Sequence, residues 1–255
     1  MALHSIIIKH IMGFLKKSLF LRSLRNGISQ ARSSLLLDYK RIKWYFTKRY
    51  KIKTYLKLHP VKKLQLGSGQ NILPGWLNTD LFPSSKDVVY LNAVEKFPIG
   101  DNTLEYIFCE HMIEHLSFCD AKFMLCECLR TLIPEGRIRI SCPCLDNFVG
   151  LYGPEKEVQK KYINWVTARY FENALEAQAS FAINSIFYNF EHKFMYDRIT
   201  LEKILEDVGF REVICSKPKM SEDPNLKNID GHDLIIGEDF NRFESLILEA
   251  SKPKE

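Results

Sequence analysis

Lys63-Leu64-Gln65-Leu66-Gly67-Ser68-Gly69 decides the fold of this chain, together with the Asn78-Thr79-Asp80 that follows it. The first segment is an apolar strand that runs into a glycine-rich turn, and the second is a strand that ends in a carboxylate. Glycines allow backbone amides to approach a ligand closely, and an acid at the next strand end can accept hydrogen bonds from both hydroxyls of a ribose. The pattern predicts a site for a nucleotide-like ligand at the carboxyl edge of a parallel sheet.

The spacing after the turn narrows the kind of nucleotide. A dinucleotide fingerprint requires a third glycine where Ile72 stands, and no Gly-Lys-Ser/Thr follows to form a phosphate-binding loop. Asp80 comes only eleven residues after Gly69. A nucleoside without a pyrophosphate therefore suits this site better than a dinucleotide does.

From Pro60 onward, strand-like and helix-like segments alternate, which predicts an α/β fold. Between the fifth strand and the last long helix lies an aromatic insertion over residues 147–195, which we expect to form a lid or substrate-binding cap over the carboxyl edge. Gly209 is placed to end that last helix. We expect strands near 62–66, 76–80, 87–91, 105–110, 136–142, 211–216 and 244–250, and helices near 119–132 and 199–208.

The connection between the first two strands is unusually short. Only six residues separate Gly69 from Trp76, whereas parallel strands normally require a crossover of about a dozen residues or more, usually a helix. We therefore predict that the first crossover helix is missing. A helix over residues 30–57 is expected to cover the exposed sheet face in its place.

Charge is distributed unevenly along the chain. Its 255 residues can bury a full core, with room for one α/β domain and additions. Residues 1–60 carry 14 Lys and Arg against one acid, a net of +13, while the remainder carries 22 basic and 30 acidic residues, a net of −8. This contrast predicts a basic helical extension over residues 1–59, attached to an acidic domain over residues 60–255.

The basic extension has two interpretations. Residues 4–26 alternate apolar and basic clusters at helical spacing, which is typical of a helix lying on an anionic membrane surface, and 30–57 read as a second basic, aromatic-rich helix. The alternative is that the apolar positions pack on the domain and the lysines are only solvated. Nucleic-acid binding is not favoured, because no recognised motif accompanies the lysines. No apolar run reaches signal-peptide or membrane-spanning length, so we expect a cytoplasmic protein, either free or peripheral at the inner membrane surface.

Seven cysteines raise the question of disulfides or a metal. Their odd number and apolar surroundings favour reduced thiols in a cytosolic protein. Cys126-x-Cys128 and Cys142-x-Cys144 are closer together than the usual zinc-ligand spacing of two to four intervening residues. We therefore expect no metal at the cysteines.

Four segments in fixed order carry a resemblance to a known family. They are residues 66–80, residues 97–116 with Glu110-His111-Met112-Ile113-Glu114-His115-Leu116, residues 134–140, and residues 192–210 with His192-Lys193-Phe194-Met195-Tyr196-Asp197. Together they resemble the class I S-adenosylmethionine-dependent methyltransferases, in particular the bacterial branch found with surface-polysaccharide genes. The resemblance implies a Rossmann-like sheet of seven strands with the last strand antiparallel. It covers residues 61–250 and leaves the basic extension outside.

The resemblance also assigns cofactor-binding residues. Gly67, Ser68 and Gly69 would wrap the methionine part of S-adenosylmethionine, and Asp80, with Leu81 beside it, would bind the ribose. The position of Asn92, before Ala93, would hydrogen-bond the adenine amino group, and Glu110 and His111 would line the methyl-donor pocket. Asn92 replaces the usual aspartate, so its amide oxygen accepts without a charge and the affinity is expected to be lower.

Catalytic candidates are less sharply defined. His192, beside Phe194 and Tyr196, is our first choice for a general base that accepts a hydroxyl proton, although it could instead cap or pack against the insertion. His115 and Glu110 are further candidates, but we expect Glu114 and His115 to form an internal hydrogen-bonded pair at a helix start. His111-x-x-Glu114-His115 matches an inverted zinc-protease motif. We do not favour a zinc-protease site here, because the motif directly follows a strand and such a site would also need a third ligand in a helical context. His232 and Asp233, after Gly231, could enter the site from the last loop, but we expect them in a surface turn.

The sequence as a whole predicts an enzyme that uses S-adenosylmethionine to methylate a hydroxyl, with a sugar or glycolipid-linked saccharide as the implied acceptor. One alternative is a methyltransferase acting on another small molecule, a lipid or a protein. The other is a non-catalytic cofactor-binding module in a glycan-assembly complex. The oligomeric state does not follow from the sequence.

Overall fold

The structure is a computed structural model that describes residues 42–154 and 157–254. The chain divides into two units, residues 1–47 and residues 48–255. A helix covers residues 42–58, so its last turns belong to the second unit, and the remaining elements described below all lie in that unit. The predicted helix over residues 4–26 falls outside the described residues.

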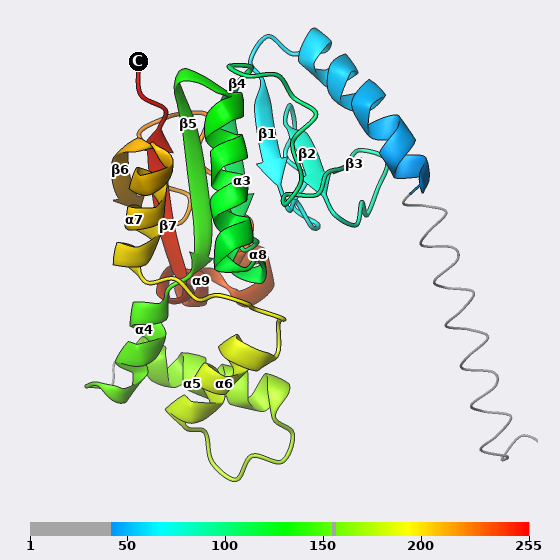
Figure 1. The fold of residues 1–255 in the computed structure, drawn as a ribbon. Helices are drawn as coiled ribbons and strands as arrows, with labels where there is room; N and C mark the ends of the chain where they lie inside the picture. The colour runs from blue at the N-terminus through cyan, green and yellow to red at the C-terminus, as the bar shows by residue number, and fades with distance from the viewer. Residues whose placement is uncertain (1–41, 155–156, 255) are drawn as a thin grey trace, which may run out of the picture. The chain divides into compact units, whose positions relative to one another are not determined.

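A seven-stranded sheet forms the centre of the second unit, in the order β3-β2-β1-β4-β5-β7-β6 (Figure 1). Strands β1 to β5 run parallel, whereas β7 lies antiparallel between β5 and β6. The expected Rossmann-like sheet with an antiparallel last strand is confirmed. The strands are β1 (Lys63–Leu66), β2 (Leu77–Asp80), β3 (Val89–Tyr90), β4 (Leu104–Glu110), β5 (Leu132–Pro143), β6 (Arg211–Ser216) and β7 (Ser245–Ser251).

One face of the sheet carries the helices and the main hydrophobic core. Leu64 pairs in register with Leu77 and Ile107, so these side chains point to the same face, where they pack with α3 (Phe118–Thr131) and α7 (Arg198–Val208). Both helices begin at a side-chain cap, Ser117 for α3 and Asp197 for α7, which satisfies a free backbone amide. Gly209 ends α7 at φ +120°, as the sequence predicts.

Irregular chain covers the opposite face. Phe108 of β4 packs there with Trp76, which directly precedes β2, and with Leu226 and Ile229, which follow β6. The same face buries Arg139 of β5, whose guanidinium is bound by carboxylates and by backbone carbonyls of the segment 217–220. A buried ion cluster and a small apolar cluster thus fix residues 217–231 to the sheet.

The first crossover contains no helix, as predicted, because residues 67–76 form only turns and extended chain. The expectation that the preceding helix takes the place of the missing one is wrong. Ile52 and Tyr55 pack into the core on the α3 side, whereas right-handed connections that run in opposite directions across a sheet lie on opposite faces. The Tyr55 hydroxyl lies 2.9 Å from the carbonyl oxygens of Lys63 and Gly75 and accepts from the amide of Lys63, so it ties the start of β1 and the end of the short crossover to this helix.

The insertion forms a helical cap with its own apolar core. It consists of α4 (Leu145–Val149), the short 3-10 helix η2 (Gly150–Tyr152), α5 (Glu157–Tyr170) and α6 (Ala179–Tyr188), and it lies beyond the end of the sheet toward which the arrow of β1 points (Figure 1). Phe148, Tyr162 and Ile186 are buried within it. Two further helices, α8 (Asp233–Ile236) and α9 (Glu238–Glu244), precede β7 and were not expected from the sequence. Phe240 and Phe243 of α9 pack onto the cap core.

No helix in the described part of the chain is both long enough and apolar enough to cross a membrane.

Candidate active site

The glycine turn after β1, residues 67–69, leaves space for a ligand because of its backbone conformation, and we call this turn the cradle. Gly67 and Gly69 have φ values of +64° and +51°, a region that L-residues with a Cβ rarely adopt. A Cβ on Gly67 would lie 2.5 Å from Cγ of Met112, whereas a Cβ on Gly69 would have nothing within 4 Å. Gly67 is therefore required for packing, and the space beside Gly69 is free for a ligand.

Asp80 lies at the end of β2, directly against this cradle. Its carboxylate accepts hydrogen bonds from the backbone amides of Gly69 (3.0 Å) and Phe82 (2.8 Å), which fixes its position. The hydroxyl of Ser68 is buried and has no hydrogen-bond partner, and a buried polar atom of this kind calls for a partner. The structure thus brings Gly67, Ser68, Gly69 and Asp80 together, as predicted, and leaves both a free hydroxyl and an open space for a ligand.

Asn92 uses its side chain within its own turn. Its amide oxygen accepts from the backbone amide of Val94 (3.2 Å), and its amide nitrogen donates to Glu95 (3.1 Å). Ala93 is the next residue of this turn. The side chain of Leu81, which directly follows β2, is 39% exposed. An adenine contact of Asn92 stays a prediction, as do the cofactor roles of Ala93 and Leu81.

Glu110 ends β4 and holds the loop that follows β6. Its carboxylate accepts hydrogen bonds from the backbone amides of Gly231 (2.9 Å) and His232 (3.1 Å) and from the side-chain amide of Asn71 (3.2 Å). Burial raises the pKa of Glu110, and the backbone amides only partly offset this. Its carboxylate anchors two loops at the sheet edge, and Glu110 is not among the residues that line the cavity described next.

A cavity of about 310 Å³ lies between the sheet edge and the cap. Its floor comes from the segment after β4 and from Pro143 at the end of β5, and its walls come from α5, α6 and α8. Most of its walls are aromatic or aliphatic, and six histidine and glutamate side chains converge on it. The apolar lining includes Trp165, Val166, Ile186, Phe190, Ile235 and Ile236, and the titratable groups other than tyrosines are His111, Glu114, His115, His192, His232 and Glu244.

His111 and His232 form one half of this polar group. Their rings stack at 3.7 Å between centroids, and Nε2 of His232 lies 3.2 Å from a carboxylate oxygen of Glu244. The other oxygen of Glu244 accepts a 2.6 Å hydrogen bond from the hydroxyl of Tyr162. Burial lowers the pKa of His111 to about 3, so its imidazole is neutral. The expectation that His232 lies in a surface turn is wrong, because Glu110 binds its amide and draws it into the cavity wall.

Glu114, His115 and His192 form the other half. The expected hydrogen-bonded pair of Glu114 and His115 is not formed, because both carboxylate oxygens of Glu114 are buried without a hydrogen-bond partner. Ile113–His115 is a single 3-10 turn, η1, and His111 precedes it with φ +44°, so the two histidines of the inverted zinc-protease motif do not share a helix. Burial raises the pKa of Glu114 to about 7.

His192 is oriented by its backbone surroundings. Its Nδ1 lies 2.5 Å from the carbonyl oxygen of Ile186, and because a carbonyl can only accept, Nδ1 carries the proton and Nε2 keeps a free lone pair. Burial lowers the pKa of His192. The ring of His115 stands edge-on to it, with centroids 4.8 Å apart. The structure thus brings His192 and His115 together, as candidates in one cavity.

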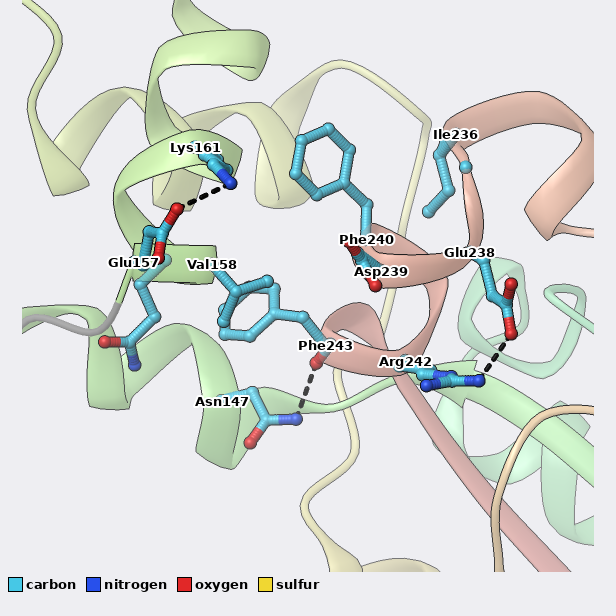
Figure 2. Close-up of a pocket in the computed structure, with 12 residues that line it drawn as sticks. Asn147, Glu157, Val158, Lys161, Ile236, Glu238, Asp239, Phe240, Arg242 and Phe243 are labelled. Carbon is cyan, nitrogen blue, oxygen red and sulfur yellow. Dashed lines mark hydrogen bonds and ion pairs between the residues drawn. The ribbon is translucent and has the colours of Figure 1, made fainter.

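A second hollow lies on the outer side of the cap, between α5 and α9 (Figure 2). Four of the charged groups drawn there form pairs along their helices: Lys161 contacts Glu157 at 2.7 Å, and Arg242 contacts Glu238. Asn147 donates to the carbonyl of Phe243 (2.6 Å) and joins the two walls. This hollow has the character of a surface groove between packed helices, whereas the cavity at the sheet edge buries its polar groups.

Sequence reasoning missed the part of the cavity that comes from residues 232–244 and from the cap. Glu244 is the first residue of a predicted strand and belongs to no local motif, and Tyr162 and Trp165 lie within the aromatic insertion without a signal of their own. The available signal was the density of aromatic residues in 147–195, which indicates a wall but not which side chains face inward.

Comparison with known proteins gives fold-level likeness only. No family model matches the chain, and no curated protein sequence matches it significantly. Among solved structures, a SAM-dependent methyltransferase from Archaeoglobus fulgidus has a TM-score of 0.46 at 18% identity, covering 86% of this chain and 99% of the other. A Thermotoga maritima protein described as a SAM-dependent methyltransferase, possibly a histamine N-methyltransferase, has a TM-score of 0.45 at 14% identity, covering 86% and 96%.

A phosphoethanolamine N-methyltransferase from Haemonchus contortus, in complex with S-adenosyl-L-methionine, has a TM-score of 0.41 at 14% identity, covering 76% of this chain and 49% of the other. With TM-scores below 0.5, these likenesses carry nothing about the reaction of this chain. Its fold class follows from its own strand order and register: a Rossmann-like sheet of seven strands with an antiparallel last strand.

Proposed function

We propose that this chain is an S-adenosylmethionine-dependent methyltransferase that methylates a hydroxyl group of a sugar or a glycolipid-linked saccharide. One observation carries the proposal: the segment after β4 borders both the glycine cradle and the cavity under the cap. Met112 packs against Gly67 of the cradle, while His111, Glu114 and His115 on either side of it line the cavity. A donor in the cradle and an acceptor in the cavity would meet across this segment.

The cradle fits the proposed cofactor. Gly67 to Gly69 offer close backbone approach, Ser68 offers an unpartnered hydroxyl, and Asp80 offers a carboxylate for the ribose hydroxyls. Ile72 stands where a dinucleotide site has its third glycine, the one that lets a following helix pack closely on the strand, and no helix follows here. When bound, S-adenosylmethionine supplies an already activated methyl group.

The acceptor class is argued from the cavity. Its volume of about 310 Å³ is at the small end of ligand sites, which suits a single ring better than a long chain. Trp165, Tyr170 and Phe190 offer flat apolar surfaces, and the imidazoles and carboxylates offer hydrogen-bond acceptors for hydroxyl groups. An acceptor with both apolar faces and several hydroxyls, such as a sugar ring, matches this combination.

The side chains of this site have defined tasks in such a reaction. Transfer of a methyl group to oxygen is an in-line displacement, so positioning and exclusion of water do most of the work. Residues of α5 and α6 line the cavity and partly enclose it, which would limit the access of water to a bound acceptor. His192, with a neutral ring and a free Nε2, can accept the hydroxyl proton.

Calorimetry with S-adenosylmethionine and S-adenosylhomocysteine tests the cofactor. We expect binding by the full chain, and at least ~10-fold weaker binding by Asp80→Ala, because it removes a charged acceptor. Ser84→Ala is the matched control, since Ser84 touches the carbonyl of Gly69 from the exposed side (3.2 Å). No heat with either compound, or equal binding by Asp80→Ala, would refute the cofactor.

Labelled methyl donor, offered with saccharide extracts, tests the acceptor. Mass spectrometry of surface glycans from cells with and without the protein would then show the loss of one methylene mass for each missing methyl group. Label that appears only in a lipid, a protein or another small molecule would instead favour the same fold acting on another nucleophile.

One observation favours a non-catalytic cofactor-binding module as the second candidate. The amide nitrogen and the amide oxygen of Asn92 already form hydrogen bonds within its own turn. The side chain therefore has less hydrogen-bonding capacity left for an adenine. Cofactor binding without methyl transfer to any extract would support this candidate.

Contact of residues 1–26 with an anionic membrane, and with it a place at the inner membrane surface, is part of the same proposal and rests on the basic, amphipathic sequence alone. Removal of residues 1–26 should release the chain from anionic vesicles without loss of cofactor binding. Unchanged vesicle binding would refute this part.

A further inference from the structure

We propose that Glu114, His115 and His192 form a binding site for a divalent transition-metal cation such as Zn²⁺ at the floor of the cap cavity. Each side chain offers one ligand atom, and these atoms all lie within 4.8 Å of one another. Two imidazoles and one carboxylate are a donor set that Zn²⁺, Mn²⁺ and Fe²⁺ accept, and three protein ligands leave further coordination positions open.

The strongest evidence is the state of Glu114. Its side chain is 1% exposed, and neither carboxylate oxygen accepts a hydrogen bond; Nδ1 of the neutral His111 lies 3.4 Å from one of them. A buried carboxylate without partners costs several kcal/mol unless it is paired or binds a metal. A cation held by both neighbouring imidazoles would supply the missing partner.

The second line of evidence is the way His192 is held. Its Nδ1 donates to the carbonyl of Ile186 at 2.5 Å. Metal-binding histidines usually donate their other ring nitrogen to a carbonyl or carboxylate, which fixes the tautomer and turns the free nitrogen toward the ion. In His192 the free nitrogen is Nε2.

The backbone joins the two segments that carry these ligands. The carbonyl oxygen of Glu114 accepts hydrogen bonds from the amides of Lys193 (2.8 Å) and Phe194 (3.2 Å). His192 therefore cannot move away from Glu114 without breaking both bonds. The ligands are held in position by the fold, although 193 and 114 are far apart in sequence.

A neighbouring triad in the same cavity provides an internal comparison. His111, His232 and Glu244 also lie within ligand distance of one another, but their polar atoms already have partners. Glu244 binds both Tyr162 and His232, and His111 contacts the hydroxyl of Ser245 at 3.0 Å. That triad is satisfied as it stands, so we assign the cation to the triad whose carboxylate is not.

The open coordination positions face the cavity, because all three ligands line it. These positions would bind an oxygen of the acceptor. That assignment rests on the proposed function, whereas the cation site itself does not. A cation there would occupy Nε2 of His192, so that this nitrogen would act as a ligand and not as the general base.

Calorimetry with Zn²⁺ alone tests the site, in the full-length chain without a histidine tag. His4→Gln/His10→Gln is the background, because these two histidines lie in the part of the chain that the structure does not describe. We expect one equivalent to bind, and at least ~10-fold weaker binding by Glu114→Gln and by His192→Gln. His232→Gln is the matched control from the satisfied triad and should bind Zn²⁺ as the background does.

Thermal unfolding of the metal-free variants separates ligand loss from misfolding. Glu114→Gln should be at least as stable as the background, because an amide replaces an ionisable group with no partner. No stoichiometric Zn²⁺ binding, binding unchanged in both ligand variants, or binding lost in His232→Gln would each overturn the site. These outcomes do not depend on methyl transfer, so the site and the proposed reaction can fail separately. If transfer is established, full activity after chelation would overturn the acceptor assignment alone.

Discussion

The imidazole of His111 stacks on that of His232, with ring centroids 3.7 Å apart and planes inclined by 23°. The contact joins the end of β4 to the loop between β6 and α8, which Glu110 also holds through the amides of Gly231 and His232. One wall of the cavity therefore depends on a contact between two stacked rings and on a buried carboxylate, Glu244, beside His232.

His232→Ala should destabilise the chain by about 1–3 kcal/mol, because it removes the stack and leaves the buried Glu244 with Tyr162 as its remaining side-chain partner. Urea unfolding measures the change. His59→Ala is the matched control, because His59 also stacks on a ring, that of Tyr55 at 4.1 Å, with no buried acid attached. Equal losses in the two variants would show that Glu244 does not need His232.

Gly67→Ala should cost more stability than Gly69→Ala. Both glycines have positive φ, which costs an L-residue about 1–2 kcal/mol, but only the Cβ at position 67 meets Met112, at 2.5 Å from its Cγ. Adding Met112→Ala to Gly67→Ala should recover part of the loss. Denaturant midpoints of the three variants test this, and equal midpoints for the two glycine variants would contradict it.

Arg139→Met should destabilise the chain by about 3–5 kcal/mol, because it leaves Asp230 and Glu249 buried without their cation. Arg137→Met, two residues along the same strand, is the control: Arg137 is partly exposed, and its Nε lies 3.9 Å from a carboxylate oxygen of Asp223. A small, similar loss in both variants would mean that the ion cluster does not hold residues 217–231 to the sheet.

Glu127→Gln should reduce stability at neutral pH by about 1–2 kcal/mol. Hydrogen bonds from Arg130 lower the pKa of Glu127 below its ordinary 4.5, although burial opposes them, and the same contact raises the pKa of Arg130. A lowered carboxyl pKa stabilises the fold above the unfolded-state pKa, and this contribution is lost as the pH falls through the folded-state pKa.

The gap in stability between wild type and Glu127→Gln should therefore close below about pH 4.5. Unfolding curves between pH 3 and 7 measure it. Glu202→Gln removes an exposed pair with Arg198 and should change stability by less than about 0.5 kcal/mol at any pH. A gap for Glu127→Gln that does not change with pH would refute the charge as its cause.

The strands of the sheet were predictable because the residues that mark the ends of the elements act locally. Gly67, Asp80 and Gly209 mark the ends of elements by their own conformational and capping preferences, and the strands between them are apolar. The missing crossover helix was also predictable, since chain length alone excludes it. The face on which residues 48–58 pack was not, because it depends on the handedness of connections elsewhere in the sheet.

The cavity was only partly predictable, because its polar groups are brought together by tertiary contacts. Glu114 and His115 suggest a pair by their spacing, but η1 is a single tight turn that separates them from each other as hydrogen-bond partners. His232 and Glu244 enter through α8, α9 and the amides that bind Glu110, none of which leaves a signature in neighbouring residues.

The division of the cavity between two sources has a practical consequence. Its apolar walls belong largely to α5 and α6, which pack around their own core of Phe148, Tyr162 and Ile186, while the glycine turn and Asp80 belong to the sheet. Under the proposed function, exchange of residues 157–188 for the equivalent stretch of another chain would change the residues around the acceptor and leave the glycine turn and Asp80 as they are.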